Sequence, residues 1–269
     1  MNETAHRSPA LNPTVPNVAR MYDFMLGGKD NYASDREAVA RLIEISPEVQ
    51  LAARWNRQFL GRAVRFVAGQ GVTQFLDVGA GLPTQQNVHQ VAQDVAADAA
   101  TVYVDNDPVV LAHANALLAG DARTAVVAGD VRDAVGILRN AEATGLLDFA
   151  RPVCLLLVAI LHFVPDADDP AALVAAFRDA LAPGSYVILS HATMDGYPAH
   201  AAADSADRAG RVYDRATSQL SMRDPAEVTR LLTGFGLVDP GLVHVTHWRP
   251  TEPPRPTFDP FLGAVGVRS

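Results

Sequence analysis

Five short, nearly continuously apolar runs alternate with alanine-rich amphipathic stretches between residues 71 and 220. A strand that is apolar at almost every position is buried on both faces, which is typical of a parallel sheet with helices on both sides. The helix-length segments between the runs supply the crossovers that parallel strands require. The predicted strands are 72–78, 101–105, 124–128, 153–159 and 186–190, and the predicted helices are 84–97, 108–119, 132–144, 170–182 and 199–220.

The two ends of the chain differ from this alternating pattern. Residues 1–16 carry prolines among small polar residues and predict a flexible head, whereas 17–70 predict three helices that form an N-terminal cap or lid. Gly27-Gly28 breaks the first helix, a second begins near Ser34 with Glu37 completing a capping box, and the third covers about 47–67. The third predicted unit, 71–269, is an α/β domain.

The last part of that domain contains a further helix start and two strand-like segments. Asp224 is placed as an N-cap, Pro225 at the first helical position and Glu227 at the third. The strand-like segments are 237–248 and 261–267.

Composition limits the kinds of protein that this chain can be. A single cysteine, Cys154, excludes an intramolecular disulfide framework and a cysteine-based zinc cage, and no metal is expected. No apolar run reaches the ~18 residues of a membrane span, and no basic-then-apolar leader is present, so we expect a cytoplasmic protein. The net charge of −8 argues against a broad phosphate-binding surface, so we expect neither nucleic acid nor membrane as a partner.

The segment 75–84 (FLDVGAGLPT) is a strand that ends in a glycine loop before a helix. Glycines let a ligand approach the backbone, and a helix start offers free amide donors, although such a loop can also be a plain tight turn. Thr84 stands where the dinucleotide pattern has its third glycine. Asp77 lies two residues before the first glycine, where a carboxylate suits an ammonium group better than a pyrophosphate.

Acidic residues end the next two predicted strands. Asp105 follows the second strand at the point where an acid accepts both ribose hydroxyls of a nucleoside, and Asp107 is expected to cap the next helix and leave Asp105 free. Asp130 follows the third strand, where it either accepts from an adenine amino group or caps a helix.

LDVGAG, VYVDNDP and AGDV, in this order and spacing, resemble the successive motifs of class I S-adenosylmethionine (SAM) methyltransferases. Residues 20–32 (RMYDFMLGGKDNY) and 155–165 (LLLVAILHFVP) are similar to an actinobacterial family of SAM methyltransferases, formerly a domain of unknown function. The resemblance extends from about residue 16 to the end of the chain. It implies a Rossmann-like fold with a seven-stranded, mostly parallel sheet, an antiparallel last strand, helices on both faces and an N-terminal helical cap.

The resemblance implies SAM as the cofactor and places its contacts by position. Asp77, Gly79 and Gly81 would hold the methionine end, Asp105 the ribose, and Asn106, Asp130 and Val131 the adenine. The expected cofactor-binding set is Asp77, Gly79, Ala80, Gly81, Asp105, Asn106, Asp130, Val131 and Ala159, with Tyr22, Gly28 and Tyr32 from the N-terminal segment.

Two histidines are catalytic candidates because they follow the fourth and fifth strands, at the edge where ligands bind in open α/β sheets. His162 is either a general base or a pocket wall, and its apolar neighbours favour the wall. His191 raises the same question. The sequence lacks the Asn/Asp-Pro-Pro-aromatic motif of many amino-directed methyltransferases, which weakens the case for DNA adenine or glutamine as the substrate.

Residues 17–32 have two interpretations. They are either a helical turn packed as core on the sheet edge or a lid that excludes water from the cofactor, and the polar residues around Gly27-Gly28 favour the lid.

Three functions follow from these patterns. The leading one is a SAM-dependent methyltransferase of a small-molecule substrate. The second is a non-catalytic SAM-binding or regulatory protein, which the sequence does not distinguish from the first. The third is an NAD-dependent dehydrogenase, against which stand Asp77, the missing third glycine and the 26-residue step from Gly79 to Asp105.

Overall fold

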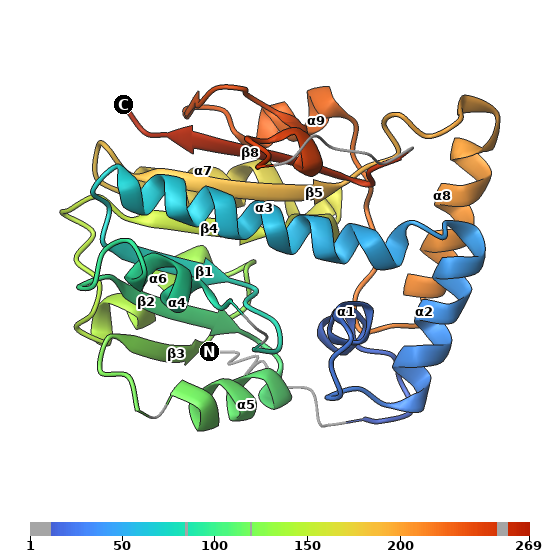
Figure 1. Cartoon of the computed structure of the whole chain (residues 1–269), viewed down its shortest axis with the longest axis horizontal. Helices are drawn as coiled ribbons and strands as arrows, with labels where there is room; N and C mark the ends of the chain where they lie inside the picture. The colour runs from blue at the N-terminus through green and yellow to red at the C-terminus, as the bar shows by residue number, and fades with distance from the viewer. Residues whose placement is uncertain (1–11, 84–85, 119, 252–257) are drawn as a thin grey trace, which may run out of the picture.

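The predicted sheet forms, and its strands lie in the order β3-β2-β1-β4-β5-β8-β6 (Figure 1). The computed structural model describes residues 12–83, 86–118, 120–251 and 258–269. The five predicted parallel strands are β1 (Gln74–Val78), β2 (Ala100–Asp105), β3 (Thr124–Ala128), β4 (Cys154–Val158) and β5 (Tyr186–Ala192). The long C-terminal strand β8 (Phe261–Val267) pairs antiparallel with β5, as the family resemblance implies.

The segment 237–248 is not one strand, contrary to the sequence prediction. It contains two short strands, β6 (Gly236–Leu237) and β7 (Val243–His244), followed by the short helix η3 (Val245–His247). Both strands pair antiparallel with β8, so together they take the seventh place in the sheet. The interruption falls at Pro240, which has no backbone N–H for a ladder, and at Gly241, whose φ is +85°.

Helices cover both faces of the sheet. One face packs against α3 (Val49–Gly69) and α4 (Val88–Gln93) through a cluster centred on Phe59, Phe75 and Trp248. The other face packs against α6 (Ala134–Ala143), α7 (Pro170–Ala180) and α9 (Pro225–Leu231). The helix α5 (Pro108–Leu118) lies against β2 and β3.

A third hydrophobic cluster lies beyond the carboxyl ends of the parallel strands, where α1 (Val18–Leu26), α2 (Ala33–Ile45) and α8 (Ala199–Tyr213) pack together (Figure 1). Its buried residues include Met21 and Leu42 from the N-terminal segment and Val212 from α8. We call these three helices the cap. The predicted boundary at residue 70 therefore does not match the packing, because α3 belongs mainly to the sheet layers and α8 belongs to the cap.

Asp35 holds the N-terminal part of the cap together. Its side chain is fully buried and accepts from the Arg20 Nε at 2.8 Å, the Asn17 N–H at 2.8 Å and the Tyr32 N–H at 2.8 Å. The helix α2 therefore begins after Tyr32, with Asp35 as the reciprocal acceptor, whereas the sequence prediction placed the cap at Ser34 and Glu37. Asp35 rather than Glu37 is the capping acceptor, because Asp35 also accepts from Arg20.

The predicted helix break at Gly27-Gly28 is confirmed. Gly27 ends α1 with φ +85°, a conformation that favours glycine. Gly28 has no room for a side chain, because a Cβ atom would overlap the carboxylate of Asp23.

The predicted flexible head is described only in its last residues, since 1–11 lie outside the described residues. Residues 12–16 contact α1: the Arg20 Nη2 donates to the Val15 carbonyl at 2.8 Å. Within the described segments, no helix is long and apolar enough to cross a membrane.

Removing the Asp35 carboxylate should loosen the cap. Asp35→Ala leaves the buried Arg20 guanidinium without its counter-ion, and breaking a buried pair in this way costs about 3–5 kcal/mol. We expect faster hydrogen exchange in 18–45 than in β1 and β4, and a lower free energy of unfolding. Asp204→Ala, which removes an exposed i,i+4 partner of Arg208, is the matched control and should change stability by less than about 1 kcal/mol. Equal stabilities of the two variants would contradict this role of Asp35.

Candidate functional site

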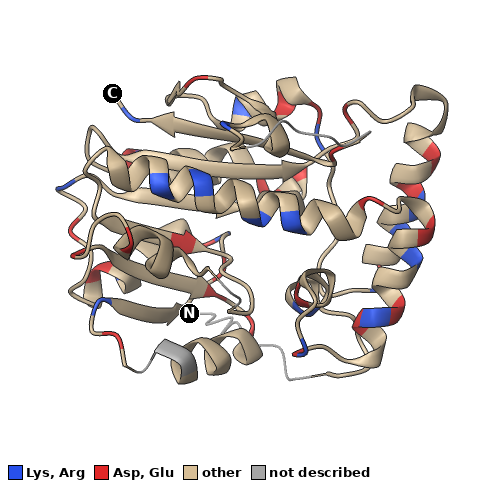
Figure 2. Cartoon of the chain, in the orientation of Figure 1, with Lys and Arg blue, Asp and Glu red and all other residues tan. Residues whose placement is uncertain are grey.

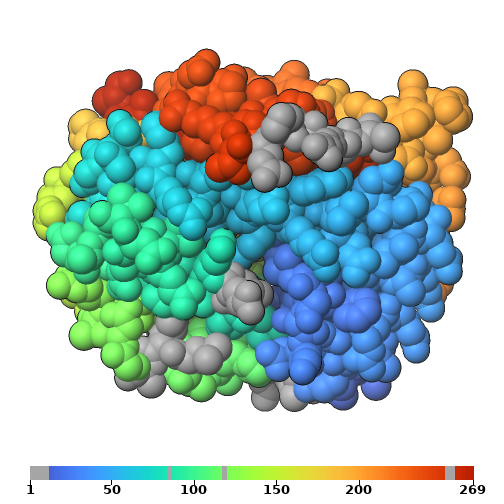
Figure 3. Space-filling model, viewed as in Figure 1, coloured from blue at the N-terminus to red at the C-terminus, as the bar shows by residue number. Residues whose placement is uncertain are grey.

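A cavity of about 280 Å³ lies between the carboxyl ends of the strands and the cap. The loops after β1, β2, β3 and β4 line one side, and residues of α1, α3, α8 and the segment 217–222 line the other. Figure 3 shows the surface hollowed between the blue N-terminal helices and the green segments that follow β1.

The glycine loop after β1 forms part of the cavity wall. Gly79 and Gly81 have φ values of +76° and +65°, in the left-handed region that side-chain-bearing residues rarely adopt. A Cβ atom on Gly79 would meet the Ile160 side chain at 2.7 Å, whereas one on Gly81 would meet nothing within 4 Å. Gly79 therefore allows close packing against the loop after β4, and Gly81 leaves open space for a ligand beside the backbone.

Asp77 is a buried carboxylate that lines the cavity. Burial, with a smaller contribution from the nearby Asp105, raises its pKa to about 7 against the opposing charge of Arg57. Among the described residues, no N–H or O–H group donates a hydrogen bond to it. An acid in this state gains most from a cationic ligand, which supplies both charge and hydrogen bonds.

Asp105 is not free, contrary to the sequence prediction. Its Oδ2 accepts from the Gly81 N–H at 2.9 Å and its Oδ1 from the Asp107 N–H at 2.9 Å. Burial raises its pKa to about 6, although these two backbone donors oppose the shift. A carboxylate oxygen accepts more than one hydrogen bond, so Asp105 keeps capacity for ligand hydroxyls on the cavity side. Asp107 caps α5 as predicted, through the Val109 N–H at 2.7 Å.

Asp130 does not cap a helix. The N-cap of α6 is Asp133, which accepts from the Gly136 N–H. Asp130 instead pairs with Arg132 and accepts from the Asn106 Nδ2 at 3.1 Å. Although burial acts to raise the pKa of Asp130, the backbone N–H and charge of Arg132 lower it overall. These contacts hold Asp130 and Asn106 together on the cavity wall, beside Val131.

His162 lines the cavity from the short helix η1 (Leu161–Phe163), which follows β4. Its Nδ1 accepts from the Ala192 N–H at 3.3 Å, and burial lowers the pKa of the imidazole well below its usual value. A backbone N–H can only donate, so Nδ1 carries no proton and the neutral ring carries its proton on Nε2. His162 therefore presents a donor, which disfavours the general-base interpretation.

His191, the second catalytic candidate of the sequence analysis, does not line the cavity. Its Nδ1 lies 2.8 Å from the Ala192 carbonyl and its Nε2 lies 2.9 Å from the Arg223 Nη1, so both ring nitrogens are occupied. Burial lowers its pKa to about 4. Arg223 is itself buried and also donates to the carbonyls of Leu161 and Val164, so the two residues fasten the loop that carries His162.

Some of the remaining cofactor-binding candidates line the cavity, and others lie elsewhere. Ala80, Ala159 and Tyr22 line the cavity. Gly28 and Tyr32 do not line it: Gly28 packs on Asp23, and Tyr32 lies 5.0 Å from the Arg20 guanidinium at the start of α2. Thr84, which replaces the third glycine, lies outside the described residues.

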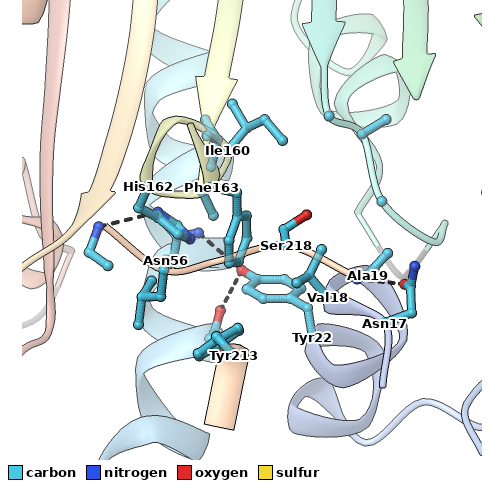
Figure 4. A pocket seen from close by; sticks show the side chains of 18 of the residues that line it. Asn17, Val18, Ala19, Tyr22, Asn56, Ile160, His162, Phe163, Tyr213 and Ser218 are labelled. Atoms are coloured by element: carbon cyan, nitrogen blue, oxygen red, sulfur yellow. Dashed lines mark hydrogen bonds between the residues drawn. The ribbon is translucent and has the colours of Figure 1, made fainter. Parts of the chain in front are cut away.

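Several wall residues escaped the sequence analysis. Figure 4 shows Asn17 at the N-cap of α1, Asn56 of α3 and Tyr213 of α8 around the same space as Tyr22 and His162. The Asn17 Nδ2 donates to the Asp107 Oδ2 at 2.6 Å, so the cap is bonded directly to the loop after β2. Asn17 precedes a helix and its capping pattern could have been recognised, but no local pattern brings α8 or 217–222 to this edge.

No group of three or more His, Cys, Asp or Glu side chains in the described parts of the chain could hold a metal ion.

Comparison with known proteins identifies the family. The profile of the S-adenosyl methyltransferase family matches residues 4–268. A crystal structure from Thermobifida fusca, of a protein provisionally named a methyltransferase, is 40% identical, with a TM-score of 0.88 over 99% of this chain and 100% of that one. A DUF574 family protein from Streptomyces avermitilis is 37% identical, with a TM-score of 0.88 over 95% of this chain and 98% of that one.

More distant structures share the fold alone. The N-methyltransferase NodS from Bradyrhizobium japonicum is 13% identical, with a TM-score of 0.51 over 80% of this chain and 97% of that one. No curated protein matches the chain. The family match and the two actinobacterial structures confirm the resemblance and decide against the dehydrogenase alternative. The chain belongs to the S-adenosyl methyltransferase family and is a SAM-dependent methyltransferase of the class I fold.

Proposed function

We propose that the cavity holds SAM across the ends of β1, β2 and β3 and a small-molecule methyl acceptor beneath the cap. The observation that carries this proposal is the pair of buried carboxylates, Asp77 and Asp105, on either side of the open Gly81 backbone. Two acids with raised pKa values in one cavity are costly to the ligand-free protein, and a ligand with an ammonium group and a hydroxylated sugar relieves that cost.

The residues present fit SAM from end to end. Asp77 would pair with the methionine ammonium group, and the backbone of Gly79–Gly81 would lie along the methionine. Asp105 would accept from the ribose hydroxyls while keeping its bonds to Gly81 and Asp107. Asp130, which Asn106 and Arg132 hold in place, would accept from the adenine amino group.

SAM supplies, when bound, a methyl group activated by a sulfonium. The chain contributes positioning and exclusion of water, the effects that such a displacement needs most. His162 is neutral and its Nδ1 already accepts a hydrogen bond from the Ala192 N–H, so its role is to shape and orient rather than to remove a proton.

The cap would act as a lid over this site. Residues of the segment 17–25 line the cavity, and polar contacts join the N-terminal segment to the α/β domain. They include the Asn17–Asp107 bond and a 3.6 Å approach of Asp30 to His113 on α5. Core packing of Met21 within the cap is compatible with a lid that moves as a unit with α2 and α8.

The net charge of −8 favours a small molecule over nucleic acid as the substrate. Figure 2 shows basic residues along α3, the most visible row of one sign. Two of these arginines are engaged: Arg62 donates to the carbonyls of Trp248 and Val245, and Arg57 donates to that of Gln86. The cytoplasmic location expected from the sequence stays a prediction.

Asp105→Asn should weaken binding of S-adenosylhomocysteine (SAH), the demethylated product, by about 2–4 kcal/mol at pH 8, because charge-assisted bonds to ribose are lost. In the unchanged protein, SAH affinity should fall as the pH drops through about 6, where Asp105 becomes protonated. Calorimetry at pH 5 to 8 checks both results. Asp207→Asn, on the exposed side of α8, removes the same charge and should bind normally. Normal SAH affinity in folded Asp105→Asn would contradict the ribose assignment.

Asp77→Asn should stabilise the ligand-free protein at pH 8 while weakening SAH binding. The folded-state pKa of Asp77 is raised to about 7, so its contribution to the free energy of unfolding is fully present below about pH 4. This contribution is lost as the pH rises through 7, because the buried acid must then ionise. Thermal denaturation between pH 5 and 8 should therefore show a flatter pH dependence for Asp77→Asn than for the unchanged protein or for Asp207→Asn. Parallel curves of stability against pH for Asp77→Asn and the unchanged protein would show that the pKa of Asp77 is not raised in the folded state.

His162→Gln should retain most methyl-transfer activity on an acceptor found by screening cell metabolites with labelled SAM. Glutamine keeps a donor and an acceptor of similar reach, and it tests the orienting role directly. A loss of about 10²–10⁴-fold in rate with unchanged SAH affinity, the effect of losing a general base, would show that His162 removes a proton. His200→Gln, at an exposed position, is the control for the loss of a histidine.

A further inference from the structure

The cavity continues under the cap into a region that differs in character from the strand-end side. Aliphatic, thioether and aromatic side chains from the cap, η1, β8 and the segment 217–222 surround it. We call this region the cap chamber. Its apolar wall consists of Met25, Leu42, Val49, Phe163, Tyr213, Leu220, Met222 and Phe261.

Aromatic rings gather on one side of the cap chamber. Phe163 lies 4.3 Å from His162 and 5.6 Å from Tyr213, between ring centroids, and Phe261 lies 5.8 Å from His162. Figure 4 shows Phe163, Tyr213 and Tyr22 facing the same space. Burial raises the pKa of Tyr213 to about 12, so its phenol stays uncharged. Such walls favour a ligand with a flat apolar body.

Two polar side chains of the chamber, Tyr22 and Asp23, are occupied by other protein groups, whereas the buried Oδ1 of Asn56 accepts from no described residue. The Tyr22 hydroxyl donates to the Ala53 carbonyl at 3.1 Å and accepts from the Asn56 Nδ2 at 3.0 Å. Asp23 turns its Oδ2 to the Asp30 N–H and the Asn31 Nδ2, at 3.0 and 2.9 Å. These donors are neutral, and Asp23 forms no ion pair with a described residue. The apolar wall itself offers no counter-charge to a charged ligand, and burial of an unpaired charge is costly.

One oriented donor stands at the boundary between the chamber and the strand ends. Ala192 N–H fixes the tautomer of His162, so its proton is on Nε2. Among the described residues, no group accepts from this Nε2–H. The orientation is rigid, because Arg223 holds the carbonyls of Leu161 and Val164 on either side of the histidine.

We propose that the cap chamber binds the methyl acceptor as an uncharged aromatic small molecule, whose carbonyl or hydroxyl oxygen accepts a hydrogen bond from the Nε2–H of His162. This inference rests on the proposed function, since it assigns the substrate class of the same cavity. His162 is thus a residue for substrate orientation and specificity. It selects an acceptor oxygen on a ring, while the apolar wall excludes carboxylates and ammonium groups.

Four single-ring probes of similar shape test the inference on the full chain with SAH at saturation. Acetophenone is neutral with an acceptor oxygen, ethylbenzene is neutral without one, benzoate is an anion and benzylammonium is a cation. Ligand-observed NMR titration gives the four dissociation constants, and calorimetry gives the SAH affinity of each variant. We expect both neutral probes to bind at least about 10-fold more tightly than the two charged probes.

The hydrogen bond is tested by the ratio of the acetophenone and ethylbenzene dissociation constants, which cancels the general apolar contribution. His162→Phe should shift this ratio by about 3- to 10-fold against acetophenone, the effect of one neutral hydrogen bond. His162→Gln, which keeps a donor, should largely preserve the ratio. Phe163→Leu is the matched control: it should weaken both neutral probes and leave the ratio unchanged.

The outcomes separate the inference from the proposed function. Absence of SAH binding by the unchanged protein overturns the proposed function. Normal SAH binding together with charged probes that bind as well as acetophenone, or with no binding of either neutral probe, overturns the substrate class. An unchanged ratio in folded His162→Phe overturns the role of Nε2–H. If His162→Phe does not fold, the ratio of the acetophenone and ethylbenzene dissociation constants in His162→Gln still tests the hydrogen bond. The order of the four dissociation constants in the unchanged protein still tests the substrate class.

Discussion

The carboxylate of Asp105 joins the parts of this protein that must stay in register for a ligand to bind. It accepts from Gly81 of the glycine loop and from Asp107 at the start of α5. Asp107 in turn accepts from Asn17 of the cap, whose backbone N–H donates to Asp35. A single line of hydrogen bonds therefore runs from the glycine loop through two strand ends into the cap, and each step uses a buried or capping carboxylate.

Buried carboxylates make the site electrostatically costly without a ligand. Asp105 lies close enough to Asp77 to raise the pKa of that carboxyl, in a cavity whose burial already raises both pKa values. The backbone N–H groups around Asp105 reduce that cost but do not remove it. Sites of this kind are typical of ligand binding, because the favourable interactions are completed only by the incoming molecule.

His162 and His191 differ because different protein groups occupy their ring nitrogens. Both follow apolar strands, and both were equal catalytic candidates from the sequence. Arg223, which is distant in sequence, occupies the Nε2 of His191 and removes that ring from the site. The Ala192 N–H occupies the Nδ1 of His162 and leaves its Nε2–H toward the cavity side. The lone pair of each ring already accepts from a protein N–H, and burial lowers both pKa values, so neither ring is poised to act as a base.

The sequence by itself determined the sheet, the glycine loop, the helix break at Gly27 and the acidic residues after β1, β2 and β3. These features depend on local chemistry: apolar runs for buried strands, a positive φ at glycine, and capping at Asp107 and Asp224. Only the tertiary structure decided that β6 and β7 both pair with β8, that Asp130 accepts from Asn106, and that α8 joins the cap. Those outcomes depend on contacts between residues far apart in the chain. The cap chamber is the extreme case, because α1, α3, η1, α8 and β8 each contribute side chains whose common position no local pattern encodes.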